Sequence, residues 1–418
     1  MLSMSIILIV FFITLVIAIL SGLIFLIPSV PIKYIKIHLY LIVLPIIISV
    51  IGLLNVSDRE QIGPFTMDHL AWLMGSFILI LGFIIQKFSV RYLIGDRNYR
   101  KYFPLFTLIT SFASIAWLSG DLRLMVLFWG ATLLSLTLLI RVNRSWKIPY
   151  EAAKVSGKSF ALGWLSLLVA VILLYVATGN WHINVTLAND DVITSGMRFI
   201  IDMLIVLAVI VPAAQFPFQS WLIESVAAPT PVSAIMHAGI VNAGGIILTR
   251  FSPVFNDPLA ITILLIIASI SVLLGSGISL VHVDYKRQLV GSTMSQMGFM
   301  LVQCALGVYS AAIIHLILHG VFKATLFLQS GSVVKRFNIP IPPSAKRSYS
   351  WVVLGRCLAI IIAILFWLGS DRSAYEILSA LILAWSLMVS WNQMVAFSRG
   401  LIGRVIGCLL YTSDAADE

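Results

Sequence analysis

The chain has 418 residues, of which 60% are hydrophobic and only 11% are charged. Ordinary soluble domains are about 45–50% apolar and about 25% charged, and a single soluble core stops growing near about 250–300 residues. The apolar excess must therefore face lipid, which predicts an all-α polytopic membrane protein. The net charge of +10 does not indicate nucleic-acid binding, because the basic residues fall in short clusters between apolar stretches, as topology signals do.

The apolar stretches, taken in chain order, predict about thirteen transmembrane helices, each long enough to cross about 30 Å of hydrocarbon. The first stretch, Met1 to Leu26, has neither a basic n-region nor a small-residue cleavage site, so it predicts a retained helix rather than a signal peptide. The predicted helices cover residues 4–26, 37–55, 69–88, 103–119, 122–140, 159–177, 198–216, 230–250, 259–280, 290–308, 310–333, 351–369 and 374–398.

Lysine and arginine are distributed unevenly between the predicted loops. With the N-terminus outside, twenty of these residues fall in cytoplasmic loops and five in outer loops. This asymmetry predicts a bacterial inner-membrane protein with an outside N-terminus. The predicted organisation is a group of N-terminal transmembrane helices over 1–68, a transmembrane core over 69–334, C-terminal transmembrane helices over 335–406 and a tail over 407–418.

The tail departs from the membrane pattern. After Arg404 the chain starts an apolar segment that is too short to cross a bilayer and then ends in acidic residues. Residues 408–418 resemble a translated sequencing-adapter read-through, so we expect a truncated C-terminus with a non-native tail.

Soluble enzyme chemistry is not indicated. The three cysteines, Cys304, Cys357 and Cys408, are far apart, without a CxxC pair or a His-rich tract, which argues against a disulfide framework and a metal site. The sequence has no Walker A, Rossmann, HExxH or GxSxG motif. We therefore expect no cofactor and no catalysis by this chain.

The most polar membrane segment runs from Gln215 to Gly245. Its prolines, Pro217, Pro229 and Pro231, lack the backbone N–H that a helix needs, and they predict a broken helix after residues 198–216. Unwound backbone at membrane depth is tolerated only where it lines a cavity or packs against protein. Transporters place ion sites at such breaks.

Two ionisable side chains belong to this segment. Glu224 is either a carboxylate of a cytoplasmic loop or a group at the mouth of an ion path. His237 is either a satisfied packing residue or a member of a proton relay, and the broken helix beside it favours the relay. Ionisable residues inside membrane spans are functional candidates by default because their insertion is costly.

A second cluster consists of His315, His319 and Lys323. Spacings of four residues place the three side chains along one helix face, each about 6 Å from the next along the axis. Histidine titrates near neutrality, so the stripe predicts proton transfer. Upstream, Lys286 either anchors the cytoplasmic end of a helix or points inward as a further relay member.

Three motifs carry a family resemblance: the run from Pro217 to His237, the run from Asp284 to Gly298, and the stripe that ends at Lys323. They resemble the antiporter-like subunits of respiratory complex I and of Mrp sodium/proton antiporters. The resemblance covers most of the chain from about residue 68 to residue 334. It implies an antiporter-like fold with inverted five-helix repeats, broken helices and a central polar axis.

The chain departs from that family at two positions of the polar axis. Gly130 stands where the family has a buried glutamate, and Val211-Pro212-Ala213 stands where it has a lysine. The lysine of the family's second broken helix has no counterpart between residues 350 and 397. A path built on that glutamate and those lysines is therefore not expected.

The run from Met236 to Pro253 is similar to the DabB branch of the family, the membrane subunits of inorganic carbon accumulation complexes. The resemblance implies a peripheral cytoplasmic partner, DabA, with a zinc site like that of a β-carbonic anhydrase. On this hypothesis the chain is an ion-translocating subunit, embedded in lipid, that uses a proton or sodium gradient. The alternatives are a proton-pumping subunit of NADH:quinone oxidoreductase and an Mrp-type antiporter subunit. The expected path comprises His237, His315, His319 and Lys323, with Lys286 and Glu224 at its cytoplasmic mouth.

Overall fold

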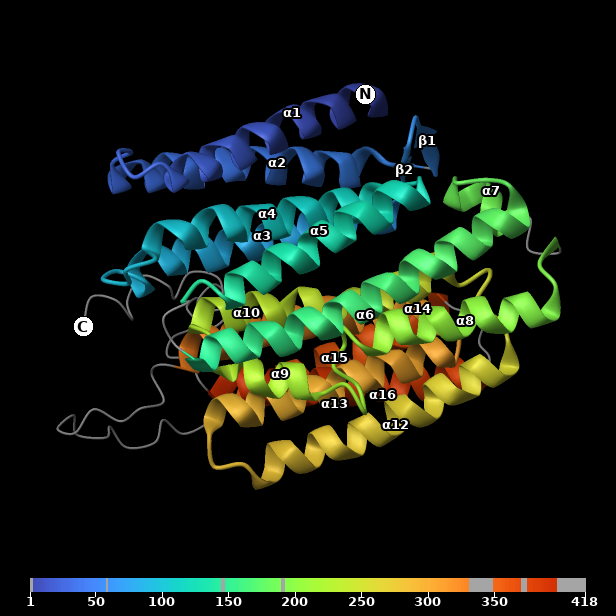
Figure 1. Cartoon of the computed structure of the whole chain (residues 1–418). Coiled ribbons are helices and arrows are strands. Elements are labelled where there is room, and N and C mark those ends of the chain that lie inside the picture. Colours follow the sequence, from blue (N-terminus) through green and yellow to red (C-terminus); the bar gives the residue numbers. More distant parts are fainter. Residues whose placement is uncertain are drawn as a thin grey trace.

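The computed structural model describes residues 3–57, 59–143, 147–188, 192–330, 349–369 and 374–396. Long helices that run roughly parallel to one another form the bundle, with α1 and α2 along one side and α12 along the opposite side (Figure 1). Within the described ranges, ten helices are long and apolar enough to cross a membrane. The predicted non-native tail, 407–418, lies outside the described residues.

All thirteen predicted stretches contain helix. The first half has α1 (Met4–Leu23), α2 (Ile35–Asn55), α3 (His69–Tyr92), α4 (Tyr99–Leu118), α5 (Leu122–Ile140), α6 (Lys147–Thr178) and α7 (Ile183–Ala188). The second half has α8 (Ser195–Ile210), α9 (Ser220–Glu224), α10 (Thr230–Ala238), α11 (Ala243–Phe251), α12 (Pro258–Val281), α13 (Tyr285–Ala305), α14 (Tyr309–Gln329), α15 (Tyr349–Gly369) and α16 (Ala374–Ala396). A hairpin of β1 (Glu60–Ile62) and β2 (Phe65–Met67) precedes α3.

The helix breaks do not all lie at the predicted prolines. Helix α8 ends at Ile210, six residues before the predicted end, and an irregular stretch over residues 211–219 follows. Pro229 and Pro231 do not interrupt a helix, because they lie at the N-cap and in the first turn of α10, where a missing N–H costs nothing. The break between α10 and α11 lies instead at Gly239 and a 3₁₀ turn, Ile240–Asn242.

Helix α13 is polar because it lies inside the bundle, with α12 covering it on the outside (Figure 1). Two glycines let these helices touch. A Cβ added at Gly275 would lie 2.5 Å from Ser295 N, and one at Gly291 would lie 2.7 Å from Ser279 N. Small residues at such contacts allow close backbone approach within membranes. This packing fixes the position of α13 beside α14.

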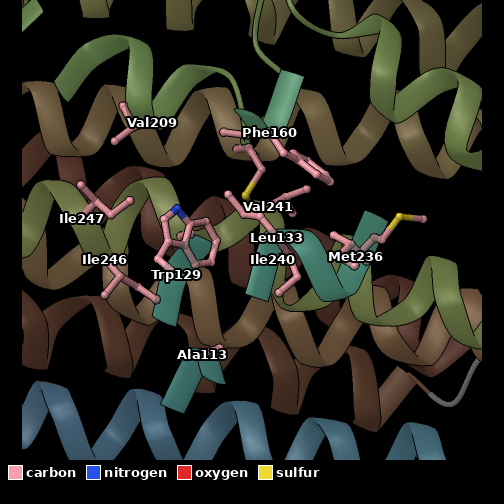
Figure 2. Close-up of a cluster of buried hydrophobic side chains, with 14 of the residues drawn as sticks. Ala113, Trp129, Leu133, Phe160, Val209, Met236, Ile240, Val241, Ile246 and Ile247 are labelled. Atoms are coloured by element: carbon pink, nitrogen blue, oxygen red, sulfur yellow. The ribbon is translucent and has the colours of Figure 1, made fainter. Parts of the chain in front are cut away.

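An apolar core joins the two halves of the bundle. Figure 2 shows Trp129 and Leu133 of α5 and Phe160 of α6 gathered with Val209 and Ile247 from the second half. All of these side chains are buried. The core therefore holds α8, α10 and α11 against α5 and α6. None of the side chains drawn in Figure 2 is ionisable.

Candidate ion-translocation site

The stripe predicted on α14 lies inside the protein. His315, His319 and Lys323 are 3%, 4% and 1% exposed, and the ring centroids of the two histidines are 6.2 Å apart. Helix periodicity places them on one face, and that face is covered by α10 and α13. Three titratable side chains thus form a continuous row through the buried part of the bundle.

His315 lies between two glutamines of α13. Its Nδ1 is 3.1 Å from Gln303 Oε1, and its Nε2 is 3.0 Å from Gln296 Oε1. A protonated imidazole donates from both nitrogens, whereas a neutral ring donates from one and accepts at the other. The charged ring therefore matches two amide oxygens, and the neutral ring requires that one glutamine presents its NH₂ group instead.

Lys323 is bound by neutral oxygens only, among the residues that the structure describes. Its Nζ donates to the carbonyl of Leu289 at 3.0 Å and to the hydroxyl of Ser292. Among the described residues, the polar contacts of this buried amine are therefore these two oxygens of α13.

His237 of α10 faces the same row. Its ring stacks on Phe327 of α14 with centroids 4.3 Å apart and an interplanar angle of 19°. Within the described chain, neither ring nitrogen of His237 or of His319 has a hydrogen-bond partner, and neither do Ser233 Oγ and Asn242 Oδ1. An unpaired buried polar group costs about 1–3 kcal/mol. In proteins generally, water bridges buried polar groups of this kind.

Lys286 lies at the edge of this cluster, and Glu224 lies beyond it. Lys286 is half-buried in the first turn of α13, and its Nζ is 3.4 Å from the carbonyl of Ala228, just before α10 begins. Glu224 ends α9 and is exposed. The structure thus brings Lys286 to the junction of α10 and α13, whereas Glu224 stays outside the buried row.

The two positions that depart from the antiporter pattern are filled by α6. A Cβ at Gly130 would lie 2.4 Å from the indole Nε1 of Trp164, which donates to the carbonyl of Val126 at 2.8 Å. A Cβ at Gly163 would lie 3.1 Å from Cδ of Pro212. Apolar packing therefore occupies the places of the family's glutamate and lysine.

Sequence reasoning missed Gln296 and Gln303, the partners of His315. Their spacing of seven residues placed them on one face of a helix, and this was the available signal. It also missed a buried ion pair: Arg250, 6% exposed, donates to both carboxylate oxygens of Asp68 and to the carbonyl of Trp117. This pair fastens the end of α11 to the start of α3.

The chain matches known families and relatives over most of its length. A family model described as NADH:quinone oxidoreductase/Mrp antiporter, TM, matches residues 119–407, and one described as NADH-Ubiquinone oxidoreductase (complex I), chain 5 N-terminus, matches residues 63–103. The chain is 59% identical to a probable inorganic carbon transporter subunit DabB of Bacillus subtilis (strain 168), over 97% of this chain and 81% of that protein. It is 55% identical to the protein of the same description from Bacillus anthracis, over 98% of this chain and 81% of that protein.

More distant relatives share the fold. An NAD(P)H-quinone oxidoreductase subunit 5, chloroplastic, of Nymphaea alba is 31% identical over 72% of this chain and 41% of its own length. The Mrp complex from Dietzia sp. DQ12-45-1b matches with a TM-score of 0.73 and 23% identity, over 96% of this chain and 49% of that one. The archaeal membrane-bound sulfane sulfur reductase matches with a TM-score of 0.70 and 19% identity, over 98% of this chain and 92% of that one. The predicted antiporter-like fold is confirmed.

Proposed function

Because the chain belongs to the NADH:quinone oxidoreductase/Mrp antiporter family, in its branch of DabB inorganic carbon transporter subunits, we propose that it carries the ion flux that drives inorganic carbon uptake. The observation that carries the proposal is the buried row of His315, His319 and Lys323. No other described membrane helix has three buried titratable side chains on one face. The relatives' description as transporter subunits agrees with a role without catalysis.

The proposed path runs along α14 and is completed by His237. Lys323 gives and takes a proton near its acceptors on α13, the unpaired nitrogens of His319 and His237 hold water, and His315 relays between two glutamines. Lys286 and Glu224 form the cytoplasmic mouth. Imidazole and amine groups transfer protons, whereas hard cations such as sodium are coordinated by oxygen atoms. A proton gradient is therefore the favoured driving force, and a sodium gradient is the alternative.

The proposed partner is a peripheral cytoplasmic subunit that contains zinc and hydrates CO₂. The relatives are named as subunits of a transporter, which supports a partner subunit. The proposed location is the bacterial inner membrane with the N-terminus outside, as the distribution of loop cations favours.

The rival functions fit less well. A proton-pumping subunit of NADH:quinone oxidoreductase and an Mrp antiporter subunit are each represented by relatives of lower identity. Gly130 and Pro212 also remove groups on which those subunits depend. The filled space around Trp164 supports a path that lies in the second half of the bundle.

The proposal is tested by co-expressing the gene with its neighbours, purifying this subunit and assaying the recovered proteins for zinc. Uptake of labelled inorganic carbon is then measured for Lys323→Met and for Lys154→Met, an exposed lysine 3.9 Å from Glu151. We expect a zinc-bearing soluble partner in both preparations and an uptake loss of about ten-fold or more for Lys323→Met alone. Recovery of flavin or iron–sulfur subunits, or equal uptake by the two variants, would overturn the proposal.

A further inference from the structure

A second buried histidine lies away from the α14 row, where the first four helices meet. His38 of α2 is 1% exposed. Its Nδ1 is 2.7 Å from Ser21 Oγ of α1, and its Nε2 is 3.2 Å from Gln86 Oε1 of α3 and 3.1 Å from Thr107 Oγ1 of α4. Each of the three partners therefore comes from a different helix.

The two hydroxyls that contact His38 also lie within hydrogen-bond distance of carbonyls of their own helices. Ser21 Oγ lies 2.8 Å from the carbonyl of Ala18, and Thr107 Oγ1 lies 2.9 Å from the carbonyl of Phe103. A hydroxyl has one proton to donate. When both hydroxyl protons go to these helix carbonyls, the two oxygens offer lone pairs to the ring, Nδ1 carries a proton, and Nε2 faces the oxygens of Gln86 and Thr107.

Gln86 decides whether Nε2 is protonated. In the orientation described, its Oε1 accepts from a charged ring, while its Nε2 is buried without a partner. Turning the amide by half a rotation lets its NH₂ donate to a neutral Nε2. Both protonation states of His38 are thus hydrogen-bonded, and only one side-chain amide must move between them.

The same arrangement recurs at the α14 row. Gln303 offers Oε1 to His315 at 3.1 Å, and its Nε2 is also buried without a partner among the described residues. His38 and His315, in separate parts of the bundle, therefore each contact a glutamine whose amide oxygen faces the ring and whose amide nitrogen has no described partner. Packing alone does not explain the histidine, because an apolar side chain would fill the space around residue 38 but leave its three polar partners without the ring.

Charged neighbours do not neutralise His38. On the helix turns around it, Lys36, Lys87 and Lys101 are exposed, and Arg100 donates to the carbonyls of Ile27 and Val30. Tyr102 donates to Asp96, away from the ring, and Phe25 packs edge-on against His38. The protonation state of His38 is therefore governed by its three hydrogen-bond partners and by burial.

We propose that His38 and Gln86 form a second buried proton-binding site, in the N-terminal helices and separate from the α14 row. The site binds one proton on His38 Nε2 and releases it when the Gln86 amide turns. It does not rest on the proposed function, because binding is measured without transport.

The test is a titration of the full-length chain, labelled with ¹⁵N-histidine, in lipid vesicles by solid-state NMR. The chain has seven histidines, and subtracting the spectrum of His38→Gln isolates the signal of His38. We expect that signal to convert from one to two protonated ring nitrogens as the pH is lowered from about 8 to about 3, because burial disfavours the charged ring. An unchanging signal across this range would overturn the proposal.

Variants of Gln86 keep the test decisive if His38→Gln does not reach the membrane. Gln86→Leu removes the acceptor of the charged ring and should lower the midpoint by about one to two pH units, whereas Gln86→Glu should raise it by a similar amount. Thr110→Ala is the matched control, because Thr110 bonds only carbonyls of its own helix. Equal midpoints in all these proteins would show that Gln86 does not set the protonation state.

Discussion

Trp164 occupies the space beside Gly130 that a glutamate side chain would need. The indole donates to the carbonyl of Val126, one turn before Gly130, and leaves 2.4 Å between its Nε1 and a Cβ at position 130. A side chain at position 130 would therefore displace Trp164.

Gly130→Glu should destabilise the protein rather than add an ion path. The new side chain displaces Trp164 and breaks its hydrogen bond, and overpacking of this kind costs about 1–3 kcal/mol. Thermal unfolding of the purified protein measures the loss. The double variant Gly130→Glu/Trp164→Ala should recover part of it, since the space is then free. A wild-type melting temperature for Gly130→Glu would contradict the packing described here.

Gln303→Leu should slow inorganic carbon uptake while the complex still assembles. The substitution removes one of the two hydrogen bonds to His315, and a hydrogen bond contributes about 0.5–1.5 kcal/mol. A loss of up to about ten-fold in uptake rate is therefore expected. Ser310→Ala, an exposed change on the next helix, is the control and should transport normally. Full activity of Gln303→Leu would separate His315 from the path.

Asp68→Ala should cost far more stability than the removal of an exposed carboxylate. It leaves the buried guanidinium of Arg250 without its bidentate partner, and breaking a buried pair costs about 3–5 kcal/mol. Glu151→Ala removes the exposed partner of Lys154 and should cost less than about 1 kcal/mol. Adding Arg250→Met to Asp68→Ala should recover stability, because no unpaired charge then remains buried. Thermal melts of the four proteins decide the matter.

Gly291→Ala should reduce transport although Gly291 is not ionisable. Its Cβ would lie 2.7 Å from Ser279 N and 2.8 Å from Gly275 O, and backbone atoms cannot rotate away as a side chain can. Helix α13 must then move, and it carries Leu289 and Ser292, the acceptors of Lys323. We expect a several-fold loss of uptake.

The matched control for that helix contact is Gly277→Ala on α12, where an added Cβ meets nothing within 4 Å. This change should leave uptake unaltered and stabilise the helix by up to about 1 kcal/mol. Equal losses in the two variants would show that the close contact between α12 and α13 does not position Lys323.

The amino-acid sequence by itself determined the class of the protein and the places of its helices. Hydropathy over about 20 residues is a local property, and lipid imposes helical structure on any segment that satisfies it. The stripe on α14 was also readable, because the spacing of His315, His319 and Lys323 repeats with the helix turn. The end of α8 and the start of α10 were predicted less well, although the proline rule applies to both: proline is accepted in a first turn and disfavours helix elsewhere.

Only the tertiary structure decided which side chains meet. His38 acquires partners 17, 48 and 69 residues away, and Arg250 pairs with Asp68 across 182 residues. Trp164 fills the place beside Gly130 from the next helix. Such pairings depend on how whole helices rotate and pack against one another, and that outcome is set by the sum of many weak contacts along their lengths. No single segment contains that information, so the partners of each buried polar group emerge only when the bundle is assembled.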